Sequence, residues 1–175
     1  KTLLESNHFN SWLYAGKVIY GFPLWGVDVK IGSEMSRTKM VADNGVVGTL
    51  QTAMSSSKSV SEQNNYALFW DGYVRLKDFS FSLGLRAEHV NFNYYSNNRY
   101  DADASYTSTL LYPSVVVSYT KGSNRVSLSY DYSVARPTYQ QLNNSTSFVS
   151  DYVYKVGNPL LRSANIHKLG LVASL

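Results

Sequence analysis

The sequence predicts an all-β fold, an antiparallel up-and-down meander of about seven strands. Apolar and polar residues alternate one by one over long segments, as in residues 125–137, RVSLSYDYSVARP, whereas helical periodicity is weak throughout. Short links alternate with long ones along the chain. Charged residues also keep to one side of the expected strands, which indicates a sheet with one polar and one apolar face.

The expected strands cover residues 11–22, 26–38, 64–76, 79–94, 106–120, 124–135 and 165–175. Turn-forming residues make three of the links short: Phe22-Pro23-Leu24-Trp25, Lys77-Asp78 and Lys121-Gly122-Ser123-Asn124. Long polar links cover residues 39–63, 95–105 and 136–164. Outer-membrane barrels have short turns on one rim and long loops on the other, so this alternation favours part of a transmembrane β-barrel over a soluble meander.

Charges avoid the apolar face of the strands. Arg125 and Asp131 lie on one face of their strand, whereas Val126, Leu128 and Tyr130 lie on the other. Lipid and a protein core both require an uncharged face, so strand length decides between them. The expected strands run about 11 to 16 residues, enough to cross the hydrocarbon and longer than the usual soluble strand. The polar face is therefore expected to line a hydrated lumen.

The same parity assigns further charged residues to the lumen: Lys30, Asp71, Arg75, Arg86 and Glu88. Arg37 and Lys39 break the pattern where their strand would leave the bilayer, and strand 106–120 is uninformative because apolar residues cover both of its faces. Aromatic residues near the strand ends predict two interfacial girdles. They are Tyr20, Phe22, Trp25 and Phe79 near the short turns, and Trp12, Tyr66, Phe92, Tyr94 and Tyr95 near the long links.

Composition excludes several classes of function. The chain has no cysteine, so it forms neither a disulfide framework nor a thiolate metal site. Its net charge is +4, and the basic residues are scattered, so we expect no nucleic-acid partner. His8, His89 and His167 lack metal-ligand spacing, and Asp101 and Asp103 lack the rest of a calcium loop. No catalytic residue, metal site or cofactor is predicted, and the chain is not expected to be an enzyme.

Four stretches in order resemble the β-barrel of TonB-dependent outer-membrane receptors, especially the Bacteroidetes type. Residues 66–89 contain the signature Gly-Leu-Arg-x-Glu, and residues 111–119 read LYPSVVVSY. Residues 128–144, LSYDYSVARPTYQQLNN, match an Arg-Pro-x-Tyr-x-x-Leu-Asn-Pro segment except that Asn144 replaces the last proline. Residues 157–162, GNPLLR, resemble the Gly-Asn-Pro-x-Leu that follows it.

The resemblance implies a single barrel segment over residues 1–175, an internal fragment of a bacterial outer-membrane receptor whose plug domain is not included. It implies energy-coupled uptake of a scarce nutrient such as a siderophore, glycan or peptide, with outer-membrane lipid, the plug and the TonB system as partners. The five lumen-facing charged residues are then candidates for plug or ligand contact. Loop aromatics are candidates for ligand contact: Tyr94, Tyr95, Tyr100 and Tyr139.

Two other architectures stay open. One is a soluble β-sandwich, an adhesin or carbohydrate-binding module whose apolar faces pack on each other. The other is a small closed outer-membrane barrel with a structural role, for which residues 41–60 would supply an eighth strand. If the fragment reading holds, the isolated chain has two unpaired edges and is expected to self-associate through them.

Overall fold

A computed structural model describes residues 3–48, 57–142, 146–150 and 153–174. The elements are β1 (Leu3–Leu24), β2 (Val27–Gly48), β3 (Ser57–Leu76), β4 (Phe79–Ser96), β5 (Arg99–Lys121), β6 (Asn124–Ala135), α1 (Tyr139–Leu142), β7 (Thr146–Ser150), β8 (Val153–Val156) and β9 (Ala164–Ser174). Within the described ranges, no helix is long and apolar enough to cross a membrane.

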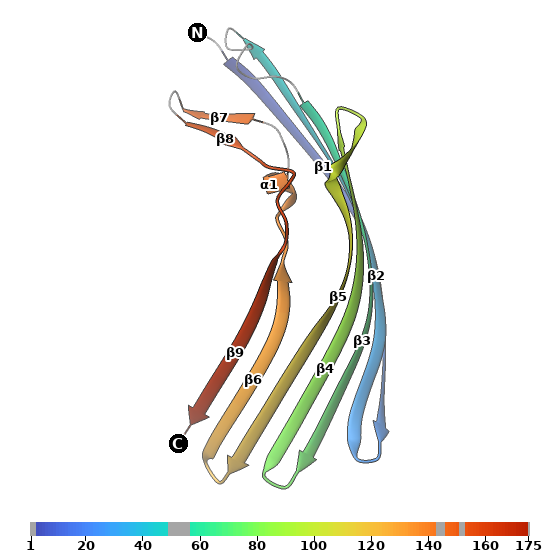
Figure 1. The fold of residues 1–175 in the computed structure, drawn as a ribbon, viewed down its shortest axis with the longest axis vertical. Coiled ribbons are helices and arrows are strands. Elements are labelled where there is room, and N and C mark those ends of the chain that lie inside the picture. The colour runs from blue at the N-terminus through green and yellow to red at the C-terminus, as the bar shows by residue number, and fades with distance from the viewer. Residues whose placement is uncertain (1–2, 49–56, 143–145, 151–152, 175) are drawn as a thin grey trace.

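Seven of the strands form one antiparallel sheet in the order β1-β2-β3-β4-β5-β6-β9, and β7 pairs with β8 separately. Strand β9 joins the sheet beside β6 after the chain has passed through α1 and the β7–β8 hairpin. Figure 1 shows the β1–β2, β3–β4 and β5–β6 hairpins at the end of the sheet where the C-terminus lies. The all-β meander predicted from the sequence is confirmed.

The strands are longer than predicted because two of the expected long links are largely strand. Strand β2 runs on to Gly48 and β3 begins at Ser57, so the described parts of residues 41–60 extend these two strands and supply no eighth one. Residues 49–56 lie outside the described residues. At about 3.3 Å per residue, strands of this length reach far beyond a hydrocarbon layer of roughly 30 Å.

A tight turn replaces the predicted long link at residues 95–105. Asn97 and Asn98 both have positive φ, 48° and 63°, between β4 and β5. Asparagine tolerates this conformation better than most residues, which suits a two-residue hairpin turn. Trp25 and Gly26, with φ of 49° and 81°, form the corresponding turn between β1 and β2. Within the described ranges, the third long link, after β6, is the one that leaves the sheet.

One face of the sheet is apolar and uncovered. Leu83, Leu85 and Leu128, which a soluble sandwich would bury between two sheets, are 47%, 46% and 48% exposed. The described residues contain no second sheet against this face, because β7 and β8 form only a separate two-stranded hairpin. The sandwich alternative is therefore wrong. The sheet ends at β1 and β9 without pairing them within the described part of the chain, so it is not a small closed barrel either.

The opposite face carries the small core of the structure. The sheet curves, and α1 lies on its inner side (Figure 1). Leu142 of α1 packs with Phe92, Tyr94 and Ala104, all buried, and the rings of Tyr106 and Tyr139 flank them. Two predicted girdle residues, Phe92 and Tyr94, thus point inward. Their assignment to a lipid interface was wrong because β4 continues past them as a strand covered by α1.

Candidate functional site

The inner face of the sheet is organised in rows set by the strand register. One row runs across all seven strands through directly paired residues: Gly21, Lys30, Asp71, Gly84, Ser114, Asp131 and Lys168. Because strand side chains alternate between faces, residues paired in this way project from the same side. The sheet therefore brings the predicted lumen residues Lys30 and Asp71 opposite each other, although they come from different hairpins.

A chain of ion pairs crosses the inner face further from the short turns. The Lys17 ammonium lies 3.5 Å from Glu34, and Arg86 lies 3.1 Å from both Glu34 and Glu88. Arg136, just after β6, pairs with the other oxygen of Glu88 and donates to the Tyr112 hydroxyl at 3.0 Å. We call Lys17, Glu34, Arg86, Glu88 and Arg136 the ion-pair chain.

The ion-pair chain is partly shielded from water. The Glu88 side chain is only 9% exposed, and those of Arg86 and Arg136 are 31% and 28% exposed. Each carboxylate is shared between two cations, an arrangement that offsets much of the cost of removing charge from water. Arg86 and Glu88 were predicted as lumen residues. Nothing in the sequence joined Arg136 to Glu88.

Close packing on this face requires a glycine at two positions. A Cβ built on Gly32 would lie 2.3 Å from the Phe69 ring, which covers it, and one on Gly84 would lie 2.8 Å from the Asp71 carboxylate. Lys17 in turn lies over the Phe69 ring, 5.1 Å from its centroid. The glycines therefore allow neighbouring side chains to lie flat along the wall.

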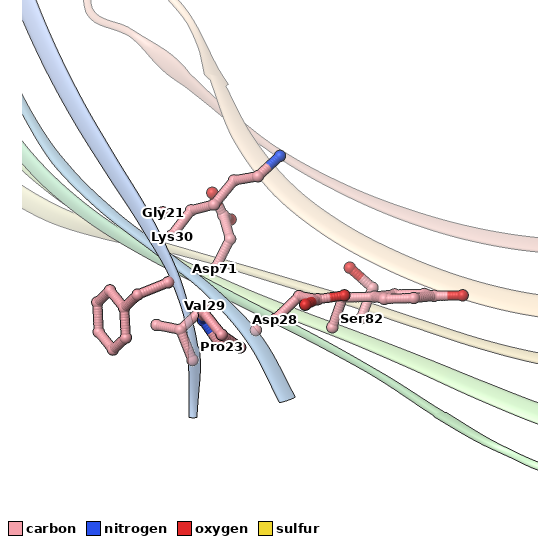
Figure 2. A pocket seen from close by; sticks show the side chains of 10 residues that line it. Gly21, Pro23, Asp28, Val29, Lys30, Asp71 and Ser82 are labelled. Carbon is pink, nitrogen blue, oxygen red and sulfur yellow. The ribbon is translucent and has the colours of Figure 1, made fainter. Parts of the chain in front are cut away.

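A hollow of about 590 Å³ lies near the short turns on the inner face, lined by Lys30 and Asp71 among others. Figure 2 shows Lys30 and Asp71 projecting from one side of the sheet and Val29 from the other. Lys30 and Asp71 face each other in the register without forming an ion pair in the described part of the chain. Arg75 lies on the same face near the hairpin and is exposed. These three charges remain available to a further partner.

The predicted ligand-contacting aromatics fall into different environments. Tyr94 is fully buried in β4, so its placement on an exposed loop was wrong. Tyr95 and Tyr100 also lie on strands, where their rings pack edge to face with centroids 5.6 Å apart, and Tyr100 is 52% exposed. Tyr139 lies in α1 and donates from its hydroxyl to Gln63 of β3 at 3.4 Å. Burial raises the pKa of the Tyr139 phenol.

The segment after β6 folds back over the inner face. Pro137 cannot donate to a ladder, and β6 ends two residues before it. The backbone N–H of Thr138 then donates to the side-chain oxygen of Gln141 at the start of α1. The backbone carbonyl of Gln141 accepts from the backbone N–H of Asn158 at 2.6 Å. Two motif segments of the sequence, around Arg136-Pro137 and Gly157-Asn158-Pro159, thus meet on the inner face.

Asp101 has a structural part here. Its carboxylate accepts from the amides of Asp103 and Ala104, both at 3.1 Å, beside the irregularity in the β4–β5 register. Among the described residues, no three His, Cys, Asp or Glu side chains gather into a metal site.

A long antiparallel sheet with an exposed apolar face and a polar, ion-paired inner face defines a segment of an outer-membrane β-barrel wall. The model of the outer membrane protein beta-barrel family matches residues 1–175, and the chain belongs to this family. The protein is thus a component of the bacterial outer membrane, and the outer-membrane β-barrel predicted from the four motifs is confirmed. A search of curated proteins found no match to the chain.

Solved structures share the fold at low sequence identity. The unliganded ferric citrate transporter FecA aligns with a TM-score of 0.57 at 13% identity, covering 75% of this chain and 22% of that one. The alcaligin outer membrane receptor FauA from Bordetella pertussis aligns at 0.58 and 11%, covering 98% and 27%. The ferric-catecholate import receptor Fiu from K12 E. coli aligns at 0.61 and 12%, covering 95% and 29%. The chain therefore spans about a quarter of these proteins.

Proposed function

We propose that residues 1–175 form a single segment of the barrel of a TonB-dependent outer-membrane receptor that takes up a scarce nutrient by energy-coupled transport. The observation that carries the proposal is the division of one long sheet into an apolar outer face and a charged inner face. The structures that share its fold are named as a ferric citrate transporter and as outer-membrane receptors for alcaligin and ferric catecholates, which supports import as the activity. A siderophore, glycan or peptide is the expected class of nutrient.

The contacts on the inner face suggest two different roles for the five predicted lumen residues, one in wall stability and one in plug contact. Arg86 and Glu88 already satisfy each other within the ion-pair chain, so they stabilise the wall. Lys30, Asp71 and Arg75 have no ion pair in the described part of the chain and lie near the short turns. In a barrel these turns face the periplasm. We therefore assign plug contact to these three.

Ligand contact is assigned to the other end of the sheet. Tyr100 is exposed there and Tyr95 packs against its ring, so the pair offers an aromatic surface, on the outer side of the rim, to a ligand that arrives from outside the cell. Tyr94 is left out because it is buried.

The test compares nutrient-limited growth of two strains, one that makes the complete receptor and one that lacks it. A panel of ferric siderophores, glycans and peptides, each supplied as the limiting source, should reveal at least one that supports growth only when the receptor is present. Uptake of that compound should stop when a protonophore collapses the inner-membrane proton gradient. Uptake that persists without the gradient would show a passive channel and overturn the proposal.

A further inference from the structure

A pocket lies where β5 and β6 separate. Their ladder begins at the Lys121–Asn124 hairpin and ends at the Ser114–Asp131 pair, although β6 continues to Ala135 beside β9. Pro113 of β5 comes next and has no N–H to donate, which accounts for a ladder that ends there. Figure 1 shows β5 and β6 diverging towards α1. The space between them is a cavity of about 240 Å³.

Two arginines line this cavity from the β6–β9 side, Arg136 and Arg162. Arg136 ends the ion-pair chain, in which three cations share two carboxylates, so the chain carries one excess positive charge. No carboxylate of the described residues pairs with Arg162. The residues that line the cavity thus include two guanidinium groups and no acidic side chain.

The guanidinium of Arg162 is held in place by neutral partners. It donates to the backbone carbonyl of Asp103 at 2.7 Å, and its Cζ lies 5.8 Å from the centroid of the Tyr106 ring. A guanidinium has five N–H donors, so this anchoring leaves most of them free. Ser108 and Ser163 add hydroxyl groups to the cavity wall. A fixed, incompletely neutralised arginine beside hydroxyl donors is the arrangement that binds carboxylate or phosphate.

We propose that the cavity between β5 and β6 is an anion-binding site that takes a carboxylate or phosphate group, with Arg162 as its main ligand and Arg136 as its second charge. The cavity is smaller than the roughly 300–1,000 Å³ of typical ligand pockets, so it holds one anionic group and not a whole oligosaccharide. The site goes beyond the proposed function and does not depend on it, because a wall of this kind binds an anion whether or not the barrel imports it.

The test uses the complete receptor, purified in detergent, with citrate and inorganic phosphate as probes and maltose as a neutral control. Isothermal titration should show saturable binding of at least one anion, weaker at higher salt, and none of maltose. Arg162→Gln should weaken it by about tenfold or more, since it removes charge-assisted hydrogen bonds. Ser108→Leu, which fills the cavity without changing charge, should weaken it as well.

The matched control is Arg125→Gln, which removes the same charge at the other end of β6. It should leave the affinity within twofold. Absence of saturable anion binding, an unchanged affinity in Arg162→Gln, or an equal loss in Arg125→Gln would overturn the site. Loss of energy-coupled uptake in the growth experiment would leave it standing, so the two proposals fail separately.

A second arm assigns the source of the anion. The receptor is placed in nanodiscs of phosphatidylcholine, with or without phosphatidylglycerol, and titrated with citrate. Citrate binding that is weaker in the phosphatidylglycerol discs than in the phosphatidylcholine discs would identify a lipid phosphate as the occupant, provided that this difference disappears in Arg162→Gln. Equal binding in both discs would identify a soluble anion from the lumen. Either result supports the site.

Discussion

Replacing Glu88 by glutamine tests the ion-pair chain at its centre. The side chain keeps its size but loses the charge that Arg86 and Arg136 share. Removing one partner of a buried pair costs about 3–5 kcal/mol, whereas an exposed pair contributes about 0–1 kcal/mol. Because Glu88 is 9% exposed but its partners are 31% and 28% exposed, we expect an intermediate loss of about 2 kcal/mol.

The assay is urea-induced unfolding of the complete receptor in detergent micelles, compared with Glu62→Gln. Glu62 also forms an ion pair, 2.7 Å from Lys39, but that pair is 21% and 46% exposed, so its loss should cost less than about 0.5 kcal/mol. Hydrogen exchange adds a local measurement. Because Arg136 anchors the start of the segment that forms α1, amides of residues 138–142 should exchange faster in Glu88→Gln only. Equal destabilisation by the two variants, or unchanged exchange, would refute the reasoning.

Three further predictions follow from the two faces and the open edges. Gly32→Ala should destabilise the barrel by about 1–3 kcal/mol, because its Cβ would meet the Phe69 ring at 2.3 Å. Gly16→Ala should not destabilise the barrel, because nothing lies within 4 Å of the added Cβ. Equal unfolding midpoints of the two variants would contradict this prediction. Leu83→Arg on the outer face should cost about 2–4 kcal/mol, if the position lies near the bilayer midplane. Ser82→Arg on the inner face should cost far less, and the reverse order would invert the assignment of faces. The isolated chain 1–175 should form β-paired oligomers in detergent through β1 and β9, and a monomer by analytical ultracentrifugation would exclude that association.

The sequence predicted the sheet well because its signal is periodic. Alternation set the face of each residue, and the register then placed Lys30 beside Asp71 without further information. The strands also continue beyond Trp12 and Phe92, where the polar composition suggested loops instead. In an outer-membrane barrel, strands extend into water above the bilayer, where their outward side chains become polar. Polar residues in these segments therefore indicate that the strand has entered water, and not that the strand has ended.

The parts that could not be predicted depend on folding across the lumen. Tyr94 and Tyr139 have the composition of exposed loop aromatics, yet one packs in the core that α1 covers and the other donates to Gln63. Arg136 and Glu88 are 48 residues apart and meet only because the chain turns inward after Pro137. No local pattern encodes such a contact, since it depends on where the inner face of a curved sheet places two distant segments.

The inner face therefore has two zones with different physical properties. Near α1 it is filled: the ion-pair chain, the buried aromatic core and the returning segment satisfy one another. Near the short turns it is open, because glycines and serines occupy positions beside Lys30, Asp71 and Arg75 and leave these charges without ionic partners in the described part of the chain. Charges that no neighbour neutralises cost little while water reaches them, and water can be displaced by a partner that supplies complementary groups. A removable partner such as a plug can bind the zone near the short turns without breaking existing ion pairs. In the zone near α1, the charges would first have to be separated from each other. This difference is the physical reason for our proposal that plug contact lies at the short-turn end and the fixed wall at the other.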